Sequence, residues 1–107
     1  MRVLAWLAMA GIVVLGSTLA AATAPKTHTV RIANMQFDPQ TLSVRSGDRI
    51  EWVTNDPFPH TASATAGAFD SKAIVANASW SYVAGKPGEY AYACTYHPTM
   101  KGKLIVQ

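Results

Sequence analysis

The feature that most limits the fold of this chain is the alternation of apolar and polar residues along short segments that end in turn residues. Ile50, Trp52 and Thr54 share one face of such a segment, and Tyr90 and Tyr92 repeat the pattern further along. A period of two residues is typical of half-buried β-strands. The 107-residue chain is too short for several domains, so one all-β domain is expected.

Turn residues divide the alternating segments at spacings of roughly 8–12 residues, which is typical of a β-sandwich or barrel. Residues 61–79 are rich in Ala, Ser and Thr, have no clear period, and leave room for a short helical turn within residues 66–78. The expected strands carry inward residues at Val30 and Ile32, Leu42 and Val44, Ile50 to Thr54, Trp80 and Tyr82, Tyr90 to Cys94, and Leu104 and Val106, with turns at 37–39, 46–48 and 85–88.

The first 24 residues have the features of a secretory signal peptide. Arg2 precedes an uncharged apolar run from Val3 to Leu19, and small residues at 20–24 fit a cleavage site. We therefore expect a signal peptide over residues 1–24, a domain over residues 25–107, and a periplasmic location without a membrane span after cleavage. The alternative is a retained anchor, because the apolar run is nearly long enough to cross a bilayer.

The charge of the chain is small and its single cysteine is unusual for an exported protein. The net charge is +3, which falls to +2 without Arg2, and the basic residues form no dense run. This charge does not indicate a nucleic-acid partner. Cys94 is the only cysteine, so it cannot form an internal disulfide. An unpaired Cys in an exported chain needs another role, and metal ligation supplies one.

Cys94, His97 and Met100 follow one another at three-residue steps between two expected strands. Thiolate and thioether ligands favour copper, and a site with two His, one Cys and a weak axial Met is the electron-transfer copper site. Only His28 and His60 remain as the second His. His60 is favoured because Pro57-Phe58-Pro59 stiffens its approach at a strand end, whereas His28 is expected to be a solvated residue at the start of the first strand.

Each of these residues has an ordinary reading as well. A lone buried Cys is usually a small apolar residue, and Met100 could simply pack in the core. Zinc also takes Cys and His, but thioether is not among its usual ligands. The three ligand types in one segment, with a Pro-His upstream, favour copper over these alternatives.

These residues resemble the small cupredoxins, the type 1 blue copper proteins, and in particular their amicyanin-like and plastocyanin-like members. The short loop from Cys94 to Met100, Phe58-Pro59-His60, and residues 88–94 and 102–106 carry the resemblance. It implies a Greek-key β-sandwich of about eight strands, with one copper ion held by His60, Cys94, His97 and axial Met100.

The resemblance also implies a function. The chain would be a monomeric periplasmic electron carrier rather than an enzyme, with copper cycling between Cu(I) and Cu(II). Its redox partners, a donor dehydrogenase or a c-type cytochrome, would dock briefly near His97, where Met35, three nearby prolines (57, 59 and 98) and Phe58 could form an apolar patch. The alternative function is copper storage, delivery or resistance; a copper oxidase is poorly supported because one domain has no room for a multi-copper centre.

Two positions depart from the family pattern. Tyr96 stands where these relatives have Pro, and its backbone N–H could point at the Cys94 sulfur. Thr61 stands where they have Asn after the first His ligand. We expect Thr61 to hydrogen-bond to the Cys94–Thr95 backbone and to tie the two ligand segments together.

Overall fold

The computed structural model describes residues 9–16 and 23–107. The predicted signal peptide, residues 1–24, lies for the most part outside the described residues. Residues 9–16 form neither helix nor strand. No helix in the described part of the chain is long and apolar enough to cross a membrane.

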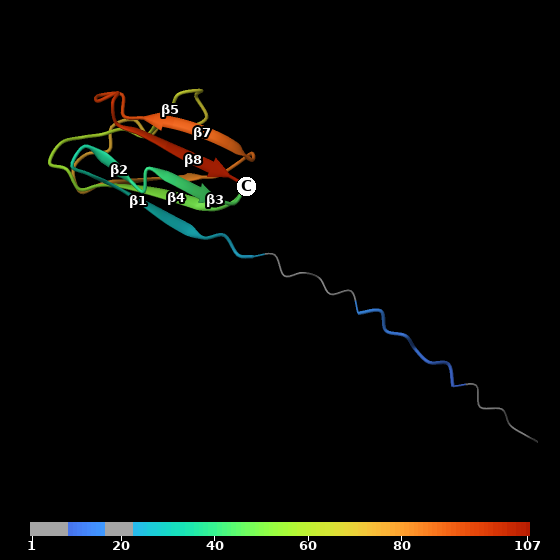
Figure 1. Cartoon of the computed structure of the whole chain (residues 1–107). Helices are drawn as coiled ribbons and strands as arrows, with labels where there is room; N and C mark the ends of the chain where they lie inside the picture. Colours follow the sequence, from blue (N-terminus) through green and yellow to red (C-terminus); the bar gives the residue numbers. More distant parts are fainter. Residues whose placement is uncertain (1–8, 17–22) are drawn as a thin grey trace, which may run out of the picture.

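In residues 23–107, eight strands form two four-stranded sheets (Figure 1). The first sheet has the order β2-β1-β4-β6, from β1 (Thr27–Ala33), β2 (Gln36–Asp38), β4 (Arg49–Thr54) and β6 (Ser79–Val83). The second has the order β3-β8-β7-β5, from β3 (Thr41–Val44), β5 (Ser63–Ala64), β7 (Gly88–Ala93) and β8 (Lys101–Val106). The prediction of an all-β sandwich with about eight strands is confirmed.

The alternating residues of the sequence point into the space between the sheets. Ile50, Trp52 and Thr54 of β4 are each 0% exposed, while their neighbours on the strand are exposed or half-buried. In β8 the buried positions are Gly102, Leu104 and Val106. One face of each of these two strands therefore packs in the core, as a period of two requires.

Aromatic rings fill the centre of the core. The Trp52 ring lies 5.5–5.6 Å from the rings of Phe69, Trp80 and Tyr92, and Tyr92 meets Phe37 edge-on at 4.7 Å. Burial raises the pKa of Tyr92 to about 12. Such aromatic pairs add about 0.5–1.5 kcal/mol each beyond the area that they bury.

Three local expectations are wrong. Phe37 and Asp38 do not make a turn; they belong to β2, where Phe37 pairs with Ile32 of β1. Residues 66–78 contain no helix, because this segment runs beside the 60–64 segment through the bridges His60–Ile74 and Ser63–Asp70. His28 is not simply solvated, since its Nε2 lies 2.9 Å from the Asp48 carboxylate.

Strand direction explains where a site can form. β1 and β4 are parallel, with Thr27 opposite Arg49 and Ile32 opposite Thr54, so both strands end on the same side of the sheet. The chain that leaves β4 continues to His60, and the chain that leaves β7 continues to Cys94. Thr61 and Cys94 are in contact. One end of the sandwich therefore carries both ligand segments, and the chain enters β1 at the opposite end.

Candidate metal centre

The loop between β7 and β8 is a compact hydrogen-bonded turn. Cys94 N–H donates to the Met100 carbonyl at 3.1 Å, His97 N–H to the Cys94 carbonyl at 3.3 Å, and Met100 N–H to the His97 carbonyl at 2.9 Å. Cys94 directly follows β7 and Met100 directly precedes β8, as the sequence predicted. These hydrogen bonds fix the backbone of the short segment that carries three candidate ligands.

The second ligand segment is anchored separately. His60 N–H donates to the Ile74 carbonyl at 3.1 Å, and Ile74 N–H donates to the His60 carbonyl at 2.7 Å. This pairing places the His60 ring, which is 0% exposed, against Cys94, also 0% exposed. The predicted preference for His60 over His28 agrees with this placement, because His28 lies on β1 and faces Asp48.

The spacing of two donor atoms suits a shared metal ion. Cys94 Sγ lies 3.7 Å from His60 Nδ1. An ion bound at about 2.3 Å from sulfur and about 2.0 Å from nitrogen, with an angle of about 110–120° between the two bonds, separates the two atoms by about 3.5–3.7 Å. The observed separation therefore fits a common ion between Cys94 and His60.

The other two candidates, Met100 and His97, lie on the same side of the sandwich as this pair. Met100 is 4% exposed and belongs to the same buried cluster as Cys94. His97 is half-buried, and its ring centroid lies 5.5 Å from that of His60. Within residues 9–16 and 23–107, no three His, Cys, Asp or Glu side chains form a metal-binding group. The candidate donors include a thiolate and a thioether, which suit copper better than zinc.

A buried carboxylate orients His60. Its Nε2 lies 2.7 Å from Asp56 Oδ2, and the same carboxylate accepts the Asn34 and Met35 N–H groups at 2.8 and 3.1 Å. Burial acts to raise the pKa of Asp56, but these three hydrogen bonds outweigh it and lower the pKa. An ionised Asp56 accepts a hydrogen bond from the Nε2–H group, which leaves the Nδ1 lone pair facing Cys94. This is the carboxylate–histidine arrangement that fixes a metal-binding tautomer.

Thr61 links the two ligand segments, as predicted. Its backbone N–H donates to Cys94 Sγ at 3.3 Å, and its hydroxyl oxygen accepts the Thr95 N–H at 2.9 Å. In the described part of the chain, Tyr96 N–H makes no hydrogen bond to the Cys94 sulfur. The proposed role of Tyr96 as the sulfur donor is therefore wrong for this structure, and Thr61 holds that position.

An apolar pocket of about 400 Å³ lies beside His97. It is lined by Met35, Phe58, Pro59, Tyr96 and His97. The Phe58 ring, 41% exposed, lies 5.2 Å from the His60 ring and 6.1 Å from the His97 ring. Three of the predicted patch residues line this pocket, and Tyr96 joins them.

The comparisons with known proteins agree with this geometry. The sequence model of the cupredoxin-like domain matches residues 4–106. The chain belongs to the cupredoxin family. It is 32% identical over 98 residues to amicyanin-alpha of Methylorubrum extorquens, a match that covers 86% of this cupredoxin and 82% of the relative. A plastocyanin of Synechococcus is 31% identical over 102 residues, covering 78% and 75% of the two chains.

Solved structures match the cupredoxin as well. An oxidized amicyanin mutant superimposes with a TM-score of 0.71 at 28% identity, covering 75% of this chain and 81% of the other. A copper-containing nitrite reductase from Thermus scotoductus has the same TM-score at 28% identity, but the match covers only 22% of that chain. The chain is thus a cupredoxin related to amicyanins and plastocyanins, and its clustered His60, Cys94 and Met100 are consistent with a type 1 copper site.

Sequence reasoning missed Asp56 as a site residue. Its partners Asn34 and Met35 lie 22 and 21 residues away along the chain, so no local motif connects them. The only signal is the spacing of an Asp four residues before a candidate His ligand. That spacing is uninformative until the turn between β1 and β2 is seen to supply the other two donors.

Proposed function

We propose that this cupredoxin is a one-electron carrier that holds a single type 1 copper ion with His60, Cys94, His97 and axial Met100. The observation that carries the proposal is the fully buried Cys94 sulfur, 3.7 Å from a His60 nitrogen whose ring is oriented by Asp56. Copper at this position would supply reversible one-electron chemistry between Cu(I) and Cu(II). We further propose that the carrier is exported to the periplasm and acts there as a monomer.

The protein's own part is to keep its donors still. Asp56 fixes the tautomer and the rotation of the His60 ring, and the Thr61 N–H donates a hydrogen bond to the Cys94 sulfur. His60 and Cys94 are both inaccessible to solvent. Side chains held in this way cannot rearrange much when the charge of the site changes by one electron, so the reorganisation that accompanies electron transfer should be small.

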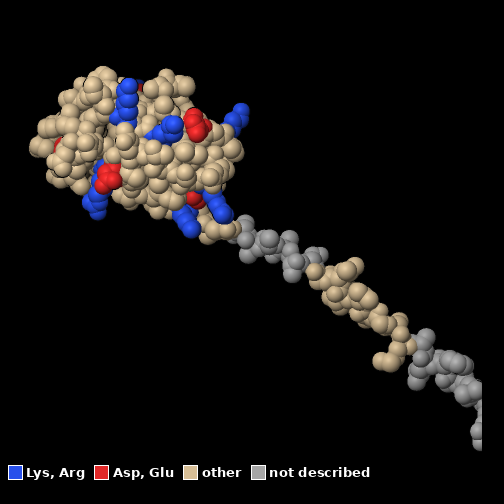
Figure 2. Space-filling model, in the orientation of Figure 1, with Lys and Arg blue, Asp and Glu red and all other residues tan. Residues whose placement is uncertain are grey.

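The pocket beside His97 is the proposed docking surface. It contains no charged residue and places the exposed Phe58 ring next to both His rings. On the face visible in Figure 2, charged residues are scattered over the sandwich without a dense patch of one sign. We propose a brief apolar contact with a donor dehydrogenase or a c-type cytochrome, since transient redox complexes have small interfaces.

Addition of Cu(II) to the protein without residues 1–24 tests the proposal. The expected result is one equivalent bound, an intense blue thiolate-to-copper band, and a reversible one-electron wave in voltammetry. The Cys94→Ser variant should lose the band, whereas the Tyr96→Phe variant, changed at a pocket residue outside the ligand set, should keep it. A colourless complex without a reversible wave would refute the carrier role and favour copper delivery or storage.

The docking surface has its own test in electron self-exchange between Cu(I) and Cu(II) copies of the protein. Phe58→Ser should slow self-exchange about tenfold or more while leaving the blue band in place. Val83→Ser is the matched control, because Val83 is 51% exposed but pairs with Arg49 at the other end of the sandwich. Equal self-exchange rates in the two variants would show that the apolar pocket is not the contact surface.

A further inference from the structure

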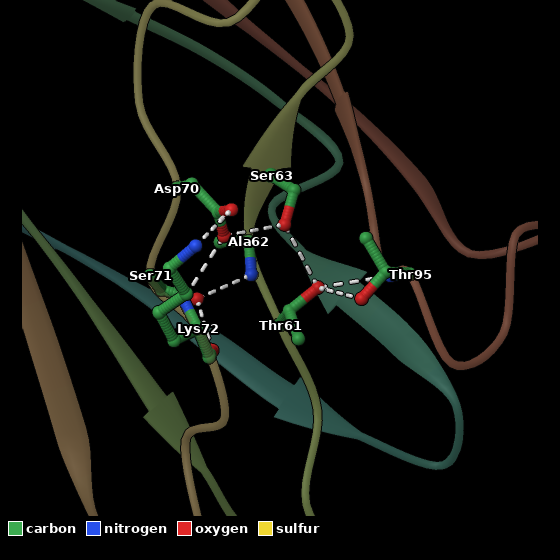
Figure 3. A network of polar contacts seen from close by, with 7 residues as sticks. All are labelled: Thr61, Ala62, Ser63, Asp70, Ser71, Lys72 and Thr95. Atoms are coloured by element: carbon green, nitrogen blue, oxygen red, sulfur yellow. Dashed lines mark hydrogen bonds and ion pairs between the residues drawn. The ribbon is translucent and has the colours of Figure 1, made fainter.

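A chain of polar contacts runs from the Cys94 loop to a carboxylate on the surface (Figure 3). Thr95 N–H donates to Thr61 Oγ1 at 2.9 Å, Thr61 Oγ1 lies 3.0 Å from Ser63 Oγ, and Ser63 Oγ lies 3.0 Å from Asp70 Oδ1. Thr61 is 2% exposed, so these contacts connect a charged group on the surface to a buried part of the site.

The carboxylate determines which way each hydroxyl points. An ionised Asp70 can only accept hydrogen bonds, so the Ser63 hydroxyl donates its single hydrogen to Asp70. Ser63 Oγ can then only accept from Thr61, and the Thr61 hydroxyl donates to it. The remaining lone pairs of Thr61 Oγ1 face Thr95, whose N–H and hydroxyl lie at 2.9 and 3.2 Å. The hydrogen bonds from Thr95 to Thr61, from Thr61 to Ser63 and from Ser63 to Asp70 all run in one direction. Such bonds polarise one another, which strengthens the bond from the Thr95 N–H to Thr61.

Asp70 is held in place although its side chain is 47% exposed. Its Oδ1 accepts the Lys72 N–H at 3.0 Å, and Lys72 Nζ lies 3.4 Å from Oδ2. These bonds, led by the Lys72 backbone N–H and followed by the Ser63 hydroxyl, lower the pKa of Asp70, which keeps it ionised at neutral pH. Lys72 has a φ of 57°, an uncommon conformation for a residue with a side chain.

A second set of bonds fixes the segment that carries Asp70. Ser71 N–H donates to the Ala62 carbonyl at 3.1 Å, and Ala62 N–H donates to Ser71 Oγ at 2.7 Å. The Ser71 hydroxyl donates to the Lys72 carbonyl at 2.7 Å. Residues 70–72 are therefore bonded across to residues 61–63, and the carboxylate has a defined position relative to Thr61.

The geometry points to Asp70 and Ser63 as positioning residues for the metal centre: through the Thr61 hydroxyl, they hold the Thr95 amide and keep the Thr61 N–H directed at the Cys94 sulfur. The inference rests on the proposed function for its effect on copper, but its effect on Thr95 belongs to the metal-free protein. Because Ser63 also pairs with Ala93 of β7, a purely structural tie would loosen the amides of β5 and β7 together, whereas the positioning role predicts an effect centred on the Thr95 amide.

Amide hydrogen exchange of the metal-free protein tests the inference. Ser63→Ala cuts the chain and Asp70→Asn removes its charge, so Thr95 exchange should be faster by about three- to tenfold in each, the range expected for loss of one ordinary hydrogen bond. Glu89→Gln is the matched control, because the Glu89 carboxylate pairs with Lys103 at 3.7 Å on the surface and is also exposed. It should leave Thr95 exchange unchanged.

The double variant separates positioning from general loosening. In the described part of the chain, the side-chain hydrogen bonds that lead from the Asp70 carboxylate to the Thr61 hydroxyl all pass through the Ser63 hydroxyl, so adding Asp70→Asn to Ser63→Ala should produce no further change at Thr95. In the copper-loaded protein, both single variants should also shift the reduction potential and the thiolate band in the same direction. Thr95 exchange within twofold of the parent in both single variants, or multiplicative effects in the double variant, would overturn the inference. A parent protein that forms no blue complex would refute the proposed function, but the Thr95 exchange rates of the metal-free protein would still test the inference.

Discussion

Replacement of Asp56 by alanine should release His60 from the carboxylate that orients its outer nitrogen. Asp56 is buried, and its carboxylate accepts three hydrogen bonds, from the His60 ring and from the Asn34 and Met35 N–H groups. An alanine cannot accept any of them. The His60 ring would then be free to rotate or to exchange its tautomer, and Nδ1 would no longer be fixed toward Cys94.

The size of the effect follows from where the three donors lie. His60 is 0% exposed, and a buried donor left without a partner costs about 1–3 kcal/mol. Asn34 is exposed and Met35 half-buried, so water can replace part of what their N–H groups lose. We expect the free energy of unfolding of the metal-free protein to fall by about 2–4 kcal/mol. Loss of such an outer partner also weakens metal binding about 10–100-fold.

Urea unfolding of the metal-free protein measures the first quantity, and competition for Cu(II) with a chelator of known affinity measures the second. Asp38→Ala is the control, because Asp38 is exposed on β2 and should change the unfolding free energy by less than about 0.5 kcal/mol. The reasoning is refuted if Asp56→Ala loses less than about 1 kcal/mol of stability and binds copper within threefold of the parent.

Three further predictions concern the scaffold. Hydrogen bonds from the Lys26 N–H, His28 and the Arg45 N–H lower the pKa of Asp48 to about 2. The stabilising contribution of the ionised Asp48 is therefore complete above about pH 4 and is lost as the pH falls toward about 2. In acid unfolding, the difference in stability between the parent and Asp48→Asn should shrink over that interval. A Cβ at Gly102 would overlap the Tyr92 ring, so Gly102→Ala should destabilise by about 1–3 kcal/mol in thermal unfolding, whereas Gly85→Ala, in open space, should not; equal melting temperatures would contradict this. Since burial raises the pKa of Tyr92 to about 12, Tyr92→Phe should leave the ultraviolet tyrosine titration below pH 11 unchanged, and a smaller absorbance change would show that Tyr92 ionises earlier.

The sequence was most informative where one residue's neighbours along the chain decide its environment. Alternation predicted that Trp52 and Tyr92 face inward, and both are buried. The position of Cys94 at a strand end followed from the same pattern. Copper ligation by the four candidates stays a prediction, although the structure brings His60 and Cys94 within 3.7 Å of each other.

The sequence was least informative where distant segments complete one another. Asp56 gains its role from the turn after β1, and Asp70 from Ser63 and Thr61 on the neighbouring segment. Residues 61–79 have no period because they are held mostly by single bridges and side-chain bonds rather than by a long strand ladder. Such bonds depend on register between segments, which a single sequence does not specify.

The parallel pairing of β1 with β4 has a practical consequence for attaching this protein to a surface. The chain enters at Thr27, and the seven residues of β1 place about 20 Å between that entry and the end of the sandwich that carries Met35 and His97. A linker fused ahead of Thr27 would therefore leave the His97 end open to solution. Immobilisation on an electrode through the same point would turn the His97 end away from the electrode. Attachment through a residue near Phe58 would instead bring the His97 end into contact with the electrode.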